Sequence, residues 1–474
     1  MTVNPAFMSM SEIAAGLARG DYSATEMAQL YLQRIDKANQ KLHAYVALDA
    51  EMTLALAKAA DDRRARGIRL SPLDGVPFAA KDLCALEGQV MTVGSQAWVD
   101  RRSEGQCTVL MKCLQAGMVL LGRTHMVEFA FGGWGTNPVM GTPWNPWDLQ
   151  TPRAPGGSSS GSGVAVAAGL APAAIGSDTG GSVRIPAGLN GITGLKTTRG
   201  LISLHGAFPL SFTLDTFGPM VRSALDAALW TQIMAGPDPA DPSSLGRPAF
   251  LWDAPEPEDA AQPLKGLRVA VMSEAQFPIE VNAQELEAFE RTCQVLRELG
   301  ASLQTVQLPF DFNDLMVRNG LIIAAEAYRV HQAYIEDESL PLGPYVRQRV
   351  LGGKSISALQ YIDAIEHQRA SSHQFSAFMR NYAALVTPTF PFPAVPLSEI
   401  DEAQTPMATF CRAGNYLTAC GLALPAGLSS EGLPLSVQLM GPSFTESTVL
   451  RLGVALQEAT SWHRAAPDLS QLGL

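Results

Sequence analysis

Two serines, Ser158 and Ser182, lie in separate glycine-rich segments of this 474-residue chain, PGGSSSGSG at 155–163 and SDTGGSV at 177–183. Glycines beside a serine free the backbone and let a substrate approach the hydroxyl and the neighbouring N–H groups closely. A serine hydroxyl presented in this way can act as a nucleophile. The pattern therefore points to covalent catalysis by serine.

The segment between the two serines is apolar and small-sided, with the sequence GVAVAAGLAPAAIG at 163–176. It predicts a buried helix followed by a short buried strand, and buried elements hold loops rigidly. The serines are 24 residues apart, which is enough for a loop, a helix and a strand to return the chain to its starting point. We expect the two loops to meet in space.

A serine needs a base to remove its proton, and Lys81 is the better candidate for that base. The seven histidines are scattered singly, and none lies beside either serine loop. A Ser-His-Asp triad stays open, because triad members are adjacent in the fold and not in the sequence. Lys81 ends the apolar run VPFAA, which predicts a strand entering the interior. Burial lowers a lysine pKa from its reference of about 10.4 and leaves some neutral amine.

These segments resemble the amidase signature family, serine hydrolases with a Ser-cisSer-Lys triad. The resemblance is carried by PLDGVPFAAKDL, PGGSSSGSG and GSDTGGSVRIPAGLNGITGLKTTRG, and it extends to GMVLLGRTHMVEFAFGG, LVTPTFPFPA and LPAGLSSEGLPLSVQLMGP. It covers nearly the whole chain, and several long motifs in the family's order are specific. The chain departs from the usual wording at Ser160, at Gly163 and at 418–420, which affects loop packing and a pocket wall.

The resemblance implies roles for the three residues. Ser182 would be the nucleophile, Ser158 the bridging serine after a cis peptide bond, and Lys81 the general base. Asp178 and Arg184 would support the loop, with a substrate contact by Arg184 left open. The backbone N–H groups expected to form the oxyanion hole are those of Thr179, Gly180, Gly181 and Ser182.

The predicted substrate contacts follow the GRTHMVEF segment. They are Phe129, Gly132, Gly133 and Trp134. With Phe131, and with Phe392 and Phe410 from the C-terminal part, the aromatic side chains predict a pocket for apolar acyl or aryl groups. Glutamine and asparagine would then be poor substrates. A place in the core is the default for any single aromatic residue.

Composition agrees with an enzyme that acts on small molecules. The net charge is 34 − 45 = −11 with no basic run, which disfavours nucleic acid and anionic membrane surfaces as partners. Six cysteines without metal-site spacing suit a reduced compartment, and we expect neither a metal nor a cofactor. The N-terminus lacks a signal-peptide pattern, so we expect a soluble cytoplasmic protein. A homodimer is left open.

The order of elements predicts an α/β fold, a single large domain with a mixed central sheet covered by helices on both faces. We expect a helical part at 1–70, a catalytic core at about 71–235, an exposed connector at about 236–266 and a C-terminal α/β part at 267–474. Two helix starts are explicit. Ser23 and Glu26 form a capping box, and Asn282 with Glu285 does the same before an amphipathic helix.

We therefore expect an amidase that cleaves a small-molecule amide, or an ester or carbamate, through an acyl-enzyme on Ser182. The first alternative is the glutaminase-type A subunit of a tRNA-dependent amidotransferase, which delivers ammonia to a partner. The second is a non-enzymatic binding protein on the same fold. A flexible linker and a phosphate-binding loop are disfavoured by the embedded apolar run and by Leu195 between Gly194 and Lys196.

Overall fold

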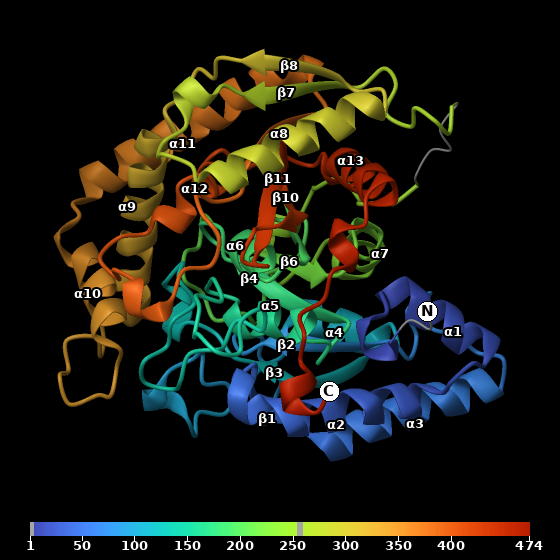
Figure 1. Cartoon of the computed structure of the whole chain (residues 1–474). Helices are drawn as coiled ribbons and strands as arrows, with labels where there is room; N and C mark the ends of the chain where they lie inside the picture. Colours follow the sequence, from blue (N-terminus) through green and yellow to red (C-terminus); the bar gives the residue numbers. More distant parts are fainter. Residues whose placement is uncertain (1–3, 254–258) are drawn as a thin grey trace.

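A computed structural model describes residues 4–253 and 259–474 of the chain (Figure 1). Its apolar segments form the strands of one mixed β-sheet, and its amphipathic segments form helices around it. In these residues the sheet has eleven strands, in the order β1-β3-β2-β4-β6-β5-β10-β11-β9-β7-β8. The strands are β1 (Tyr45–Leu48), β2 (Pro77–Lys81), β3 (Val119–Thr124), β4 (Ala173–Asp178), β5 (Thr193–Lys196), β6 (Thr216–Val221), β7 (Arg268–Met272), β8 (Ser302–Val306), β9 (Ala384–Pro388), β10 (Cys420–Leu428) and β11 (Pro434–Gly441).

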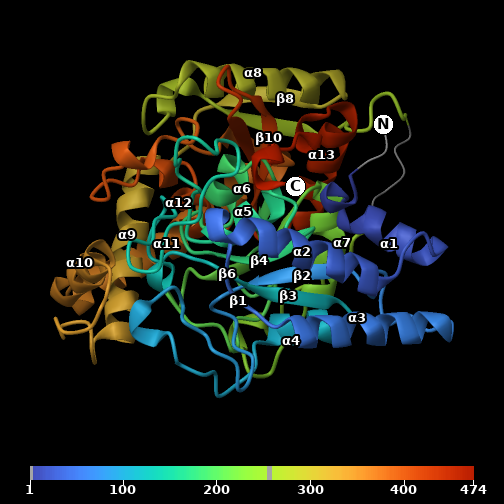
Figure 2. The same cartoon turned by 60° about the horizontal axis from the view of Figure 1, so that its bottom comes forward.

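Helices surround this sheet, as Figure 2 shows from a second direction. The α-helices are α1 (Met10–Arg19), α2 (Ala24–Leu42), α3 (Ala50–Ala65), α4 (Thr108–Gln115), α5 (Ser160–Ala167), α6 (Arg184–Leu189), α7 (Ala224–Met234), α8 (Ala283–Glu298), α9 (Phe312–His331), α10 (Pro344–Gly352), α11 (Ala358–Phe378), α12 (Arg412–Tyr416) and α13 (Glu446–Ala459). Short 3-10 helices are η1 (Pro5–Phe7), η2 (Gln96–Trp98), η3 (Glu128–Ala130), η4 (Pro242–Ser244), η5 (Glu274–Gln276), η6 (Gly353–Ser355), η7 (Met379–Asn381), η8 (Leu397–Glu399), η9 (Pro406–Ala408), η10 (Trp462–Arg464) and η11 (Ser470–Leu472).

The sheet combines parallel and antiparallel pairs, which confirms the predicted mixed α/β architecture. β2 runs parallel to β3 and β4, and β7 runs parallel to β8 and β9. Between them, β5 lies antiparallel to β6 and β10. The strands β1–β6 therefore form one side of the sheet and β7–β11 the other, and the pairing of β5 with β10 joins the two halves of the chain.

Strand β2 shows how both faces of the sheet are covered. Phe78 packs edge-on against Trp230 of α7, with ring centroids 5.8 Å apart. Lys81 lies three positions further along β2, and side chains alternate along a strand. Lys81 therefore faces the opposite side, where it contacts residues just before α5. The strand ends with its lysine buried, as the apolar run predicts.

The two predicted helix starts have different outcomes. Ser23 and Glu26 form the capping box that opens α2. At α8, Asn282 caps the helix by accepting a hydrogen bond from Gln284 N, but Glu285 does not complete a box. Glu285 is fully buried and accepts a hydrogen bond from Ser436 N on β11 (3.2 Å), because α8 packs against that strand.

The N-terminal part contains more than helices, since β1 pairs with β3 at the edge of the sheet. The connector at 236–266 includes residues 254–258, which lie outside the described residues. In the rest of it, Ser244 and Leu264 are buried and Leu251 is exposed. Among the described residues, no helix is both long and apolar enough to cross a bilayer.

Candidate active site

Lys81 lies at the centre of a cluster of serine hydroxyls. Its Nζ atom is 2.8 Å from Ser158 Oγ, 2.9 Å from Ser159 Oγ and 2.8 Å from Ser177 Oγ. Parallel pairing brings the ends of β2 and β4 to the same edge of the sheet, which places Ser177 beside Lys81. Ser158 and Ser159 come from the turn before α5. Ser159 and Ser177 were not predicted as partners of this lysine.

The surroundings of Lys81 favour the neutral amine. The side chain is fully buried, and burial lowers its pKa to about 7. Within the described residues, no carboxylate lies within salt-bridge distance of its nitrogen. An ammonium group can donate to all three hydroxyls, whereas a neutral amine donates to two and accepts from the third. The cluster can therefore hold either form of Lys81 and pass a proton to one serine.

The two serine loops are connected by a backbone hydrogen bond. The Gly157–Ser158 peptide bond is cis, and the Ser158 carbonyl accepts a hydrogen bond from Val127 N (3.1 Å). The next amide, Ser159 N–H, donates to the Ser182 carbonyl (3.3 Å). Ser158 is fully buried, while Ser182 keeps a small exposed surface and lines a cavity. Ser182 is thus the member of the pair that faces the cavity. No histidine in the described residues bonds to either serine side chain or to Lys81.

Asp178 organises the turn that carries Ser182. Its carboxylate accepts hydrogen bonds from Gly181 N (2.7 Å) and Val183 N (3.1 Å), and its Oδ1 atom is 3.0 Å from Arg184 Nη2. Both charged side chains are fully buried. Burial by itself would raise the pKa of Asp178, but the Arg184 guanidinium holds that pKa well below its usual range. The pair fixes the loop, and Arg184 does not line the cavity.

The four backbone N–H groups predicted for an oxyanion hole differ in availability. That of Gly181 already donates to Asp178 Oδ1. Those of Thr179, Gly180 and Ser182 donate to no acceptor in the part of the chain that the structure describes. Gly181 has φ of 119°, and a Cβ there would lie 2.7 Å from Cys411 Cβ, so the turn needs glycine.

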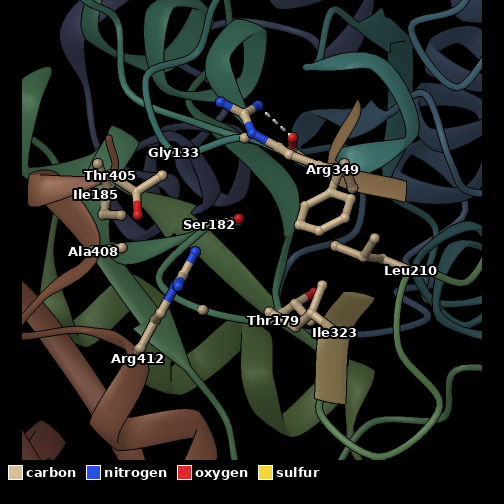
Figure 3. Close-up of a pocket in the computed structure, with 14 residues that line it drawn as sticks. Gly133, Thr179, Ser182, Ile185, Leu210, Ile323, Arg349, Thr405, Ala408 and Arg412 are labelled. Atoms are coloured by element: carbon tan, nitrogen blue, oxygen red, sulfur yellow. Dashed lines mark hydrogen bonds between the residues drawn. The ribbon is translucent and has the colours of Figure 1, made fainter. Parts of the chain in front are cut away.

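A small cavity of about 40 Å³ opens beside Ser182 (Figure 3). Its walls come from four regions of the chain: the loop around 130–133, the 179–185 turn, the segment before β6 that carries Leu210, and helices and loops of the C-terminal half. The lining residues are Ala130, Phe131, Gly132, Gly133, Thr179, Gly180, Ser182, Ile185, Leu210, Ile323, Arg349, Thr405, Ala408 and Arg412.

Of the predicted substrate contacts, Gly132 and Gly133 line this cavity, and Phe129 and Trp134 do not. Phe129 is fully buried and packs on His331, with ring centroids 4.3 Å apart. Trp134 stacks on Phe392 and donates its indole N–H to a loop carbonyl. These two aromatic side chains pack in the core beside the cavity, because the distant C-terminal half brings His331 and Phe392 to cover them.

The cavity carries two arginines that the motifs did not single out. Arg349 is bonded to Glu402 Oε2 (2.7 Å) and to the Phe131 carbonyl (2.9 Å). Arg412 begins α12, and Figure 3 shows its guanidinium directed toward Ser182. The sequence signal that could have indicated Arg412 is that it is the single charged residue of the segment TPMATFCRAGNYLTACGLA at 405–423.

Comparison with known proteins identifies the family of this chain. The family model described as Amidase matches residues 26–450, and the chain belongs to this family. The A subunit of glutamyl-tRNA(Gln) amidotransferase from Chloroflexus aggregans is 36% identical, over 98% of this chain and 99% of the relative. The amidase signature resemblance is confirmed, and the family is one of enzymes.

Solved structures show the same fold. The peptide amidase from Stenotrophomonas maltophilia is 27% identical with a TM-score of 0.83, covering 97% of this chain and 98% of that one. An inhibitor-bound chain from a vestigial protein complex, described as revealing the origins of an s-triazine catabolic enzyme, is 30% identical with a TM-score of 0.86. That match covers 95% of this chain and 98% of the other.

Proposed function

We propose that this protein hydrolyses the C–N bond of a small amide through an acyl-enzyme on Ser182, with Ser158 as proton relay and Lys81 as base. The observation that carries the proposal is the buried Lys81 amine, 2.8 Å from Ser158 Oγ with a pKa of about 7. A base with a pKa near the working pH is the effective kind. Ser182 supplies the hydroxyl that faces the cavity.

In this mechanism neutral Lys81 accepts the Ser158 proton while Ser158 takes the proton of Ser182. The Ser182 oxygen then bonds to the amide carbon, and negative charge develops on the carbonyl oxygen. The backbone N–H groups of Thr179, Gly180 and Ser182 would donate hydrogen bonds to that oxygen. The C–N bond breaks as the same relay returns the proton to the leaving nitrogen. Water attacks the ester, and a second passage of the proton releases the acid and restores the enzyme.

A fluorophosphonate probe tests the nucleophile. We expect one adduct on Ser182, mapped by mass spectrometry, and loss of both the adduct and amide turnover in Ser182→Ala. Ser160→Ala is a matched control, since Ser160 is buried in the other serine loop and its hydroxyl has no hydrogen-bond partner among the described residues. An adduct on another residue, or turnover retained in Ser182→Ala, would overturn the assignment. Turnover also separates an enzyme from a binding protein on this fold.

The second candidate is the A subunit of a glutamyl-tRNA(Gln) amidotransferase. Curated relatives of that name are 35–38% identical over 97–98% of this chain, and they favour this candidate over a free-standing amidase. Such a protein would release ammonia from glutamine for its partner. Tagged protein isolated at its natural level of expression should then bring down an ATP-using partner and show glutaminase activity that the partner stimulates. Full amide turnover by the isolated chain without glutaminase activity would exclude it.

A further inference from the structure

Arg412 enters the cavity without a carboxylate partner. Within residues 4–253 and 259–474 no acidic side chain is within salt-bridge distance of it, and its one hydrogen bond is a long contact from Nη1 to the Met316 carbonyl (3.5 Å). The guanidinium passes over Gly320 of α9, where an added Cβ would lie 3.2 Å from Nη1. This glycine gives the arginine its path to the cavity.

The second arginine of the cavity, Arg349, differs from Arg412 in having a carboxylate partner. Arg349 is held by Glu402 and by the Phe131 carbonyl. Burial and the neighbouring Arg349 charge lower the pKa of Arg412 to about 10, so Arg412 is still a cation at neutral pH. A partly buried cation without a counter-ion is costly, and an anion that enters the cavity would offset that cost.

Asn319 provides an independent observation at the same place. Its side chain is fully buried, and neither its amide nitrogen nor its amide oxygen has a hydrogen-bond partner among the described residues. A Cβ on Gly180 would lie 3.2 Å from Arg412 Cγ and 3.3 Å from Asn319 Oδ1. Both side chains therefore lie against the loop proposed to hold the oxyanion. Buried polar groups normally have partners, so a ligand at this loop would supply hydrogen bonds that the described residues do not give Asn319.

We infer that the substrate cleaved at Ser182 carries a carboxylate that pairs with Arg412, and that it carries no cation beside that carboxylate. The inference rests on the proposed function. The expectation that the substrate carries no cation follows from the cavity walls, which in the described residues include two arginines and no Asp or Glu. The α-ammonium of glutamine would face these cations without a counter-charge. The substrate class is therefore a short monoamide of a dicarboxylic acid, in keeping with a cavity of about 40 Å³.

Binding to Ser182→Ala protein, measured by calorimetry, tests the charge without any turnover. Succinamate is compared with 4-methylpentanamide, in which an isopropyl group replaces the carboxylate, and glutaramate with glutamine, which adds only the α-ammonium. We expect the anion of the first pair to bind about 10- to 100-fold more tightly, the range for a hydrogen-bonded charge. Glutaramate should bind more tightly than glutamine. Equal affinities in the first pair would overturn the carboxylate, and tighter binding of glutamine would overturn the exclusion of a cation.

Variants locate the effect. Arg412→Gln should reduce the succinamate preference about 10-fold or more, and Arg412→Lys should restore part of it, since lysine keeps the charge but not the planar fork. Gly320→Ala keeps Arg412 but pushes its guanidinium, so we expect a smaller loss. Arg318→Gln is the matched control, because Arg318 is on α9 outside the cavity and pairs with Asp314. An unchanged preference in Arg412→Gln would refute the inference.

The two proposals can fail separately. If the wild-type protein is labelled at Ser182 and cleaves neutral amides with no preference for anions, the anion site is wrong and the proposed function stands. If succinamate binds through Arg412 but Ser182 is neither labelled nor needed for turnover, the catalytic assignment is wrong and the anion site stands.

Discussion

Removal of the Ser177 hydroxyl should move the pH dependence of activity to lower pH. The ammonium form of Lys81 can donate to the hydroxyls of Ser158, Ser159 and Ser177, whereas the neutral form can donate to only two. The third hydroxyl therefore stabilises the charged form more. A hydrogen bond to a charged group exceeds one between neutral groups by about 1–1.5 kcal/mol, which corresponds to about one pH unit.

The assay is kcat/KM for a short amide between pH 5 and 9, which reports the free enzyme. The wild-type value should rise with pH and reach half its maximum at about pH 7, because the neutral amine is the base. At that pH about half of the protein carries neutral Lys81, against about one molecule in 3,000 for a lysine with a pKa of 10.5. The midpoint of Ser177→Ala should lie about one pH unit lower.

Ser160→Ala controls for loss of a buried hydroxyl near the site, since Ser160 Oγ has no partner in the described residues and the midpoint should not change. An unchanged or higher midpoint in Ser177→Ala would show that Lys81 is not the titrating base. A bell-shaped profile centred near the pKa of histidine would point to a different base.

Three further outcomes are expected. Ser158→Ala should lower kcat by about 10²–10⁴-fold, as for a lost proton-transfer group, with the fluorophosphonate rate at Ser182 falling in parallel. Asp178→Asn should destabilise the fold by about 3–5 kcal/mol in urea unfolding, because it leaves the Arg184 charge buried without its partner. Incubation with EDTA should leave activity unchanged, because the proposed relay consists of a lysine and two serines.

Each of these outcomes has a contrary result. Wild-type kcat in Ser158→Ala would remove that serine from the relay. An unchanged urea midpoint in Asp178→Asn would mean that the ion pair does not hold the 178–184 turn. Activity lost in EDTA and restored by added metal would contradict a mechanism that needs only side chains of this chain.

Local patterns in the sequence predicted the elements that carry the site. The apolar run before Lys81 predicted a buried strand, and the small residues after Ser158 predicted the helix and strand that became α5 and β4. These predictions succeed because burial and backbone freedom depend on neighbouring residues. The long motifs also identified the family, now confirmed by the match over 26–450.

Contacts across the fold were not predictable in the same way. Ser177 reaches Lys81 only because β2 and β4 pair in parallel, 96 residues apart in the chain. Glu285 has the spacing of a capping residue, but packing of α8 on β11 directs it to Ser436. The N–H of Gly181 is in the expected loop, but it donates its hydrogen bond to Asp178 Oδ1 and is not free for a substrate oxygen.

The sequence by itself indicated the groups that we propose to react, because Lys81, Ser158 and Ser182 stand in motifs whose glycines and apolar runs shape their own loops. Only the tertiary structure decided what surrounds those groups. Arg412 and Asn319 come from α12 and α9, and nothing near either in the chain shows that both reach the Ser182 loop. Of the aromatic residues that the motifs placed near the site, Phe129 and Trp134 pack in the core, and Phe131 lines the cavity. Chemistry is encoded locally, while the charge and shape of a cavity depend on packing between distant segments.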